Sequence, residues 1–482
     1  MAFELRIFGN NVKSKSSTIS AEDRTNVYFD IPTEPDRAPV AAYGTPGTES
    51  FCYPSGAVTR GMYYMPSTGG MFALQGRKLL LINGTTPTLV ATLPNSNDTD
   101  GSAHFTDNGA QLLIVTNGFG YIVDTKNAYK IFDITAKLPE GGSDSCTFLD
   151  SYFIVNRRNT QQFYISSPYD GLTWNALDFA SAESSPDNLV AVSANNGYLH
   201  LLGELSTEIW VNNGGALFPF DRIQGATITY GLVSIDSLAV INTSLIGLVR
   251  DRYGMLAIGT IAGGQFAAIS TPDITYIINK YDSITSAVGF VYGLNGRYFY
   301  QITFNGNASW LYDFKAQAWS RIASWDLDYS KYRFGLAFGT KFIVSSATTG
   351  QLASISADVY TEEGEQIVRE ITFNQIFAPT QNFSLISRIR AWMETGQGLV
   401  GTNLLTEPQG INPTVYLQIS RDSGHTWGER MPTEIGRRGE FKSRAEWRRL
   451  GQARSWCLRI RMTDPVRFCL TDISLAVGEA NS

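Results

Sequence analysis

The chain has 482 residues, of which 43% are hydrophobic and only 17% are charged, and its net charge is −6. That length predicts two or three domains rather than one. The small charged fraction is typical of a surface that other subunits cover. An acidic chain is not expected to coat itself with nucleic acid, so any contact with a polyanion must be local. The many Gly, Tyr, Phe and Trp residues favour tight turns and strands, which indicates an all-β fold.

The cysteines and the N-terminal residues bear on where the protein is made. Four cysteines, Cys52, Cys146, Cys457 and Cys469, are too few for a disulfide-stapled secreted domain, and they form no CxxC pair. Residues 1–6 lack the basic region and apolar run of a secretory signal, and no apolar stretch approaches the roughly 18 residues of a membrane span. We therefore expect synthesis in a reducing cytoplasm, without membrane insertion.

Residues 1–55 are polar and include a proline-rich stretch at 31–39. They lack the regular strand pattern of the residues that follow. We expect them to form an arm together with a strand that closes the last repeat of the next domain.

Residues 56–360 are predicted to form a β-propeller, because short apolar strands recur at intervals of roughly 35 to 50 residues, the size of a four-stranded blade. Most follow a turn signal such as Asn108-Gly109 or Asn295-Gly296. Seven segments are interpreted as inner strands: 77–82, 111–115, 151–155, 197–202, 244–249, 296–302 and 340–344. Segments 129–134, 174–179 and 319–322 are interpreted as outer strands. Seven blades are the first choice and six the second, and a generic all-β chain with hairpins that only look periodic is the alternative.

Residues 361–482 are predicted to form a β-sandwich. Five longer segments with alternating apolar and polar residues mark its strands: 367–377, 384–393, 414–420, 455–462 and 467–477.

The sequence offers few groups for catalysis. His104, His200 and His425 are the only histidines, they lie in different repeats, and their spacing fits no zinc motif. No phosphate-binding loop or dinucleotide fingerprint occurs. We expect no cofactor, no metal and no enzymatic activity, and each histidine is interpreted as a strand or turn residue.

One motif is typical of propeller hydrolases. Residues 420–427 fit the SxDxGxTW pattern of the Asp-box found in sialidases, through Ser420, Asp422, Gly424, Thr426 and Trp427. Its residue types indicate a turn, in which Asp caps backbone amides, Gly supplies a positive φ, and Trp anchors the hairpin in the core. In sialidases this box lies away from the catalytic centre, so we interpret it as structural. A weaker copy stands at 167–174.

The C-terminal end is basic. From Glu429 onward eleven Arg and Lys stand against seven acids, so this end is +4 and the rest −10. On strands, alternation would place a set of these side chains on one face, opposite Trp447. The candidate partner-binding face consists of Lys442, Arg444, Arg448, Arg459 and Arg461. A solvated face with Glu446 bridging its arginine neighbours is the alternative. As a binding surface it favours an acidic protein partner over DNA, because a channel in which DNA slides should not hold phosphates tightly.

Several segments resemble the packaged-DNA stabilisation proteins of short-tailed phages, also called tail hub or nozzle proteins. The strongest likeness lies at 419–427, 434–451 and 459–466, with further likeness at 24–29, 43–47, 230–235 and 251–254. The propeller centre, for example 244–249, departs most from the family pattern. The resemblance implies a subunit of a six-fold ring in the virion tail, made in the bacterial host cytoplasm. It also implies contact with the portal adaptor, with tail fibre, spike or needle proteins, and with packaged double-stranded DNA without sequence specificity.

Two other classes remain open: a glycan-binding propeller without a ring role, and a sialidase-like hydrolase. The residues of a glycosidase site on a propeller axis would be scattered between blades, so sequence can neither locate nor exclude them.

Overall fold

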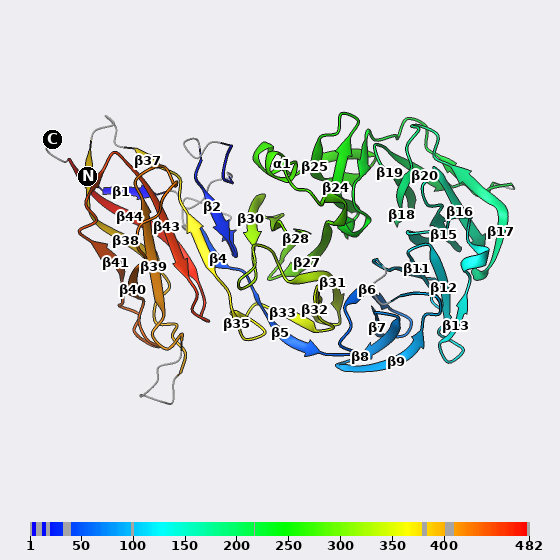
Figure 1. The fold of residues 1–482 in the computed structure, drawn as a ribbon, viewed down its shortest axis with the longest axis horizontal. Coiled ribbons are helices and arrows are strands. Elements are labelled where there is room, and N and C mark those ends of the chain that lie inside the picture. Colours follow the sequence, from blue (N-terminus) through cyan, green and yellow to red (C-terminus); the bar gives the residue numbers. More distant parts are fainter. Residues whose placement is uncertain are drawn as a thin grey trace.

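The computed structural model describes residues 2–5, 12–15, 20–31, 40–97, 101–215, 217–377, 383–400 and 409–479. They form two lobes side by side: a ring of small sheets, and a sandwich of two larger sheets that contains both ends of the chain (Figure 1).

The ring is a β-propeller in which the described residues form seven blades (Figure 1). Blade 1 is β6 (Thr59–Met65), β7 (Gly70–Gln75), β8 (Lys78–Asn83) and β9 (Thr86–Thr92). Blade 2 is β10 (His104–Asp107), β11 (Gln111–Thr116), β12 (Phe119–Asp124) and β13 (Lys130–Asp133). Blade 3 is β14 (Cys146–Leu149), β15 (Tyr152–Asn156), β16 (Gln162–Ser167) and β17 (Asp170–Ser181). Blade 4 is β18 (Leu189–Asn195), β19 (Tyr198–Gly203), β20 (Thr207–Asn212) and β21 (Phe220–Arg222).

Two of the remaining three blades differ from this pattern: blade 5 has a fifth strand, and blade 7 takes one of its strands from the N-terminal segment. Blade 5 is β22 (Tyr230–Leu232), β23 (Ala239–Ile241), β24 (Ser244–Asp251), β25 (Leu256–Ala262) and β26 (Gln265–Ala268). Blade 6 is β27 (Val288–Leu294), β28 (Arg297–Phe304), β29 (Ala308–Asp313) and β30 (Ala318–Ile322). Blade 7 is β31 (Tyr332–Phe338), β32 (Lys341–Ser346), β33 (Leu352–Ser356) and, from the N-terminal segment, β5 (Gly47–Cys52). Between strands lie η1 (Thr135–Lys137), η2 (Ile235–Ser237), α1 (Pro272–Ile278) and η3 (Ile284–Ser286). Among the described helices, none has the length and apolar character needed to span a bilayer.

The ring closes between blade 7 and blade 1, where β31 lies against β6. The seven apolar segments predicted as inner strands lie inside their blades, but none of them is the innermost strand. Six of them are the second strand of their blade, and residues 77–82 fall on the third strand, β8. The reason is burial. A second strand such as β11 is covered on both faces and reads as a continuous apolar run, whereas the innermost β10 is only partly buried. The three predicted outer strands do coincide with the outermost strands β13, β17 and β30.

The sandwich packs two sheets around one apolar core that contains Phe29, Ile389, Trp456, Leu458 and Phe468. The first sheet, here called the outer sheet, is β3 (Val27–Asp30), β4 (Ala41–Gly44), β44 (Cys469–Glu479), β38 (Ser384–Met393) and β41 (Ala445–Arg448), with β1 (Ala2–Leu5) and β42 (Gln452–Ala453) at its margins. The second, the inner sheet, is β2 (Asp23–Thr25), β36 (Arg369–Thr372), β43 (Ser455–Met462), β39 (Thr414–Ser420) and β40 (Met431–Glu434), with β37 (Ile376–Phe377) on β43. Three strands, β38, β39 and β43, have the bounds predicted from the sequence.

The N-terminal segment contributes to both lobes. Strand β5 pairs with β33 as the outermost strand of blade 7, and the short β34 (Thr361–Glu362), which pairs with β35 (Glu365–Gln366), lies on its other side. Strands β3 and β4 belong to the outer sheet, while β2 joins β36 of the sandwich to β30 of blade 6. The inner sheet therefore continues into the propeller.

Asn26 fixes this junction. It has a φ of 55°, and its side-chain amide donates to the carbonyls of Ala323 (2.7 Å) and Val368 (3.0 Å). Its Oδ1 accepts from the amide of Ala323 at 3.0 Å. One buried side chain thus bonds to the chain leaving blade 6 and to the chain entering the sandwich.

Candidate functional site

The propeller axis holds a cavity of about 550 Å³. Strands β6, β10, β14 and β18 line one side of it, and η2, β27 and β31 line the other. The named lining strands are the first strands of their blades, which surround the propeller axis. A propeller enzyme would bring its catalytic groups together at such a position.

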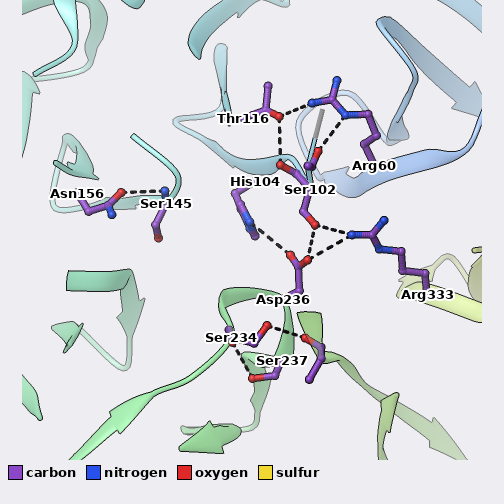
Figure 2. A network of polar contacts seen from close by, with 12 residues as sticks. Arg60, Ser102, His104, Thr116, Ser145, Asn156, Ser234, Asp236, Ser237 and Arg333 are labelled. Carbon is purple, nitrogen blue, oxygen red and sulfur yellow. Dashed lines mark hydrogen bonds and ion pairs between the residues drawn. The ribbon is translucent and has the colours of Figure 1, made fainter. Parts of the chain in front are cut away.

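A polar network crosses the axis at this cavity (Figure 2). Its centre is Asp236 of η2, in blade 5, which accepts a short hydrogen bond from the hydroxyl of Ser102. His104 Nε2 of blade 2 lies 3.5 Å from Asp236 Oδ1, and the Arg333 guanidinium of blade 7 lies 3.5 Å from Oδ2. Arg333 also donates to Ser102 Oγ at 2.9 Å. Side chains from blades 2, 5 and 7 thus meet across the axis.

Buried hydrogen bonds hold η2, and with it Asp236, in place. Ser237 Oγ donates to the carbonyl of Ser234 at 2.7 Å, and Ser234 Oγ donates to the carbonyl of Ala287 at 2.7 Å. Tyr300 Oη donates to the carbonyl of Ser237 at 2.7 Å. The carboxylate is therefore carried on a turn that three buried hydroxyls fix to blade 6 and to itself.

Arg60 organises the loop that carries Ser102. It is only 2% exposed, and it donates to the Gly101 carbonyl at 2.9 Å and to Ser96 Oγ at 2.9 Å. It also donates a short hydrogen bond to Thr116 Oγ1, which in turn donates to the Ser102 carbonyl at 3.1 Å (Figure 2). A buried guanidinium with several acceptors is strongly anchored.

The chemistry of this network is that of a structural cross-link. Ser102 and His104 both contact the same carboxylate, and among the described contacts none joins Ser102 to His104, as a nucleophile and its base require. Burial lowers the pKa of His104, with Asp236 opposing that shift, so the imidazole is neutral at neutral pH. Among the described residues, no group of three or more His, Cys, Asp or Glu could hold a metal ion.

The other two histidines lie elsewhere. His200 is buried in β19, where burial lowers the pKa of its imidazole, and His425 is exposed in the turn after β39. The sequence placed all three on strands or turns, and it gave no sign that His104 meets Asp236, since 132 residues of chain separate them.

The Asp-box residues form a hydrogen-bonded turn at the end of β39. Asp422 Oδ1 accepts from the Thr426 amide at 2.8 Å, and its Oδ2 accepts from Thr426 Oγ1 at 2.6 Å. The Gly424 amide donates to Ser420 Oγ at 2.8 Å, and Gly424 has a φ of 84°. The hydrogen bonds from Thr426 and Ser420 lower the pKa of Asp422.

Trp427 does not anchor this turn in the core, so that part of the interpretation was wrong. Its ring is half-buried and lies under the guanidinium of Arg459, whose Cζ is 3.9 Å from the ring centroid. The inward position belongs to Trp456 of β43, which is 1% exposed. The weaker copy makes a similar turn, in which Asp170 accepts from the Leu172 amide at 2.9 Å and from Thr173 Oγ1 at 2.6 Å.

The candidate basic face is divided between the two sheets of the sandwich. Arg448 lies on β41 of the outer sheet, with Lys442 and Arg444 in the exposed loop before it. Arg459 and Arg461 lie on β43 of the inner sheet, where both pair with Glu370, at 3.3 and 3.5 Å. The expectation of a single face was therefore wrong, because alternation along a strand shows which residues share a side but not which sheet the strand joins.

Two further arginines, which were not predicted from the sequence, lie beside Arg448 on the outer sheet. Arg388 and Arg390 of β38 stand opposite Arg448 and Glu446 of β41. Glu446 accepts from Arg390 at 2.7 Å and from Arg448 at 2.5 Å, and these hydrogen bonds lower the pKa of Glu446. The alternation of 384–393 could have revealed these arginines, since Ile389 and Ala391 mark the inward positions between them.

Comparison with known proteins identifies the family. Residues 28–360 match the family model described as bacteriophage P22 Gp10, beta-propeller, and residues 372–478 match the model described as bacteriophage P22 Gp10, beta-sandwich. No curated protein matches the chain. Among solved structures, the extracellular domain of the putative hybrid two component system BT4673 from B. thetaiotaomicron is similar over 64% of this chain and 40% of that one, at 10% identity and a TM-score of 0.42. The two family models together cover most of the sequence in their domain order, and the chain therefore belongs to the bacteriophage P22 Gp10 family of phage tail hub, or DNA-stabilisation, proteins.

Proposed function

We propose that this chain is a subunit of a six-membered tail hub ring that extends the DNA channel below the portal and its adaptor, retains packaged DNA and anchors tail fibres, spikes or a needle. The observation that carries the proposal is the presence of both P22 Gp10 family domains, in order, in one chain. The continuous sheet from blade 6 through β2 into the sandwich supports it, because a subunit of a tail under mechanical stress needs two lobes held in a fixed relative position.

The axial network bears on the path of DNA. The Asp236 carboxylate contacts side chains of three separate blades across the axis, and the cavity beside it holds about 550 Å³. A duplex would have to break these contacts to pass. In the proposed ring, the DNA channel therefore lies between subunits and not through the axis of any one propeller.

We also propose that the protein is not an enzyme. A retaining or inverting glycosidase uses two carboxyl groups that flank the substrate. Of the described residues that line the axial cavity, Asp236 is the one carboxylate, and Ser102, His104 and Arg333 already engage it. The Asp-box lies on the sandwich, outside the propeller. Its Asp422 carboxylate already accepts two hydrogen bonds from Thr426 within the turn.

The experiment is to delete the coding sequence from the phage genome that carries it and to purify the resulting particles. The proposal expects heads that package DNA but release it, so that the DNA becomes sensitive to added nuclease, and it expects protection to return when the wild-type chain is supplied. Particles without the chain that keep nuclease-resistant DNA and complete tails would contradict the proposal.

A turnover assay tests the non-enzymatic part separately. Purified chain is expected to release no sugar from sialosides or from host lipopolysaccharide. Release that disappears in Asp236→Asn, while circular dichroism shows the variant to be folded at the assay temperature, would establish a catalytic axis instead.

A further inference from the structure

Charge is distributed unevenly along this chain. Residues 159–249, from the second half of blade 3 through blade 4 and into β24 of blade 5, contain eight acids and one basic residue, Arg222, which gives −7. From Glu429 onward the balance is reversed, with eleven Arg and Lys against seven acids. The two regions lie at opposite ends of the molecule, because β17 and β20 are at the edge of the propeller farthest from the sandwich (Figure 1).

The acidic end has a hollow between blades 3 and 4 with a volume of about 690 Å³. Glu183 and Asp221 lie on its lining and are exposed, and no ion pair to either is found among the described residues. The one arginine there, Arg222, lies 3.7 Å from Glu208 and is balanced locally. Asp221 accepts a short hydrogen bond from the side-chain amide of Asn213, which leaves its negative charge without a cation. Carboxylates around a hollow that lack an ion pair favour a cationic partner.

Blades 3 and 4 also expose large apolar side chains. Leu177 on β17 is 79% exposed and Leu217, before β21, is 98% exposed. Phe179, at 37% exposure, lines the hollow itself. Large apolar groups that stand out among charges are typical of a surface that another protein covers.

The basic end is the outward face of β38 and β41, on the side of the sandwich away from the propeller (Figure 1). Arg388 and Arg448 are directly opposite each other, and both are exposed. Glu446 engages Arg390 and Arg448, while among the described residues no ion pair to Arg388 is found. Asp472 of β44 stands opposite Trp392 on the same face, so Arg388, Arg390 and Arg448 lie there together with the acids Glu446 and Asp472.

This face also has an aromatic anchor. Trp392, next to Arg390, is 51% exposed, and the Arg390 Cζ lies 5.8 Å from its ring centroid. Leu385 at the start of the strand is 40% exposed. Tryptophan and arginine are the residues that most often dominate protein interfaces.

We propose that the basic face, defined by Arg388, Trp392 and Arg448, binds the acidic hollow, defined by Phe179, Glu183 and Asp221, of a second copy of this chain. A contact between two identical ends would bring like charges together, so the contact is head to tail. Such a contact repeats from one copy to the next and makes a ring when its rotation closes. The inference rests on the proposed ring subunit and assigns the two surfaces through which neighbours meet.

Two charge reversals on the full-length chain test the contact. The propeller swap is Glu183→Lys with Asp221→Lys, and the sandwich swap is Arg388→Glu with Arg448→Glu. Self-association is measured by sedimentation velocity at low and at high salt, and thermal unfolding shows that each variant is folded. Glu49→Lys with Asp282→Lys, at exposed acids on blade 7 and before blade 6, is the control of equal charge change.

The wild-type chain is expected to associate at low salt and to dissociate as salt rises. Each swap alone is expected to weaken association about tenfold or more, because it opposes like charges, whereas the control is expected to leave it unchanged. Mixing the two swapped chains restores association, since each then offers the other a complementary surface at both ends, and closed assemblies of the mixture contain an even number of chains. A chain that carries both swaps associates with itself.

Three results would overturn the inference: a wild-type chain that stays monomeric at low salt, swapped chains that associate as the wild type does, or swapped chains that dissociate but are not restored by mixing. The last result would show that the two surfaces bind a different partner. None of these results depends on whether virions contain the chain, so the inference and the proposed function can fail separately.

Discussion

The propeller and the sandwich are both built from antiparallel strands, but they join strands over different distances along the chain. Blades 1 to 6 are each made from one continuous stretch of sequence, and among the described strands only blade 7 takes one, β5, from far away. In the sandwich, β4 pairs with β44 and β2 pairs with β36, so residues near 25 and 42 are completed by residues near 370 and 470. The sandwich therefore forms only when both ends of the chain are in place.

This difference predicts where substitutions cost most. The largest effect is expected for Trp456→Ala in the sandwich core, where the side chain is 1% exposed and its Nε1 donates to Ser384 Oγ at 2.9 Å. Losing a buried tryptophan should lower the free energy of unfolding by about 3–5 kcal/mol. Urea unfolding measures this. Trp427→Ala is the matched control, and because Trp427 is half-buried we expect it to cost about 1 kcal/mol. Equal costs would show that the core has been placed wrongly.

Closure of the propeller is the next most sensitive point. A Cβ on Gly47 would lie 2.3 Å from the Thr361 carbonyl oxygen and 2.6 Å from that of Val359. Gly47→Ala should therefore push β5 away from β34 and cost about 1–3 kcal/mol. Hydrogen exchange should rise at β5 and β33 and stay unchanged in blade 3. If exchange rises evenly around the ring, β5 is not a separate closing strand.

The axial cross-link should have an effect of similar or smaller size. Asp236→Asn removes the charge that Arg333 and His104 face, and leaving these groups without it should cost about 1–3 kcal/mol. A double-mutant cycle with Arg333→Met isolates the pair. Additive costs would mean that the two side chains are not coupled across the axis.

The last prediction concerns a dependence of stability on pH at the junction between the lobes. Burial raises the pKa of Glu362 to about 7, against the opposing effects of a hydrogen bond from Ser324 and the charge of Lys331. The folded chain then holds a proton there that the unfolded chain has lost above pH 4.5, so stability falls as pH rises from about 4.5 to 7 and then levels off.

Glu362→Gln should remove this dependence. Relative to the wild type, the variant should gain about 3 kcal/mol at pH 8.5 and little at pH 4.5. Thermal unfolding at both pH values measures the gain. An equal gain at both would show that the carboxyl does not titrate in this range.

The features that could be predicted from the sequence are local ones, namely turns and the bounds of single strands. Of the predicted turn dipeptides, Asn295-Gly296 has positive φ at both residues and Asn108-Gly109 only at Gly109. The strands 384–393, 414–420 and 455–462 have the predicted bounds. In each case the signal lies in consecutive residues, as a turn preference or as alternation along one strand.

The sequence could not predict the strand pairs and side-chain contacts that join residues far apart along the chain. Nothing in residues 23–25 or 41–44 marks them as strands of the sandwich, because β2 and β4 each pair with a strand more than 300 residues away. For the same reason the arginines of β41 and β43 were placed on one face although the strands belong to different sheets. The contact of Asp236 with His104 and Arg333 follows only from the closure of the ring.

The most direct test of the central claim, that this chain is a tail hub subunit, is its copy number in purified virions, measured by quantitative mass spectrometry relative to the portal protein. The account predicts six copies of this chain per portal ring, retained with the tail when heads and tails are separated. Absence from the particles, or a variable substoichiometric amount that washes off with salt, would contradict it.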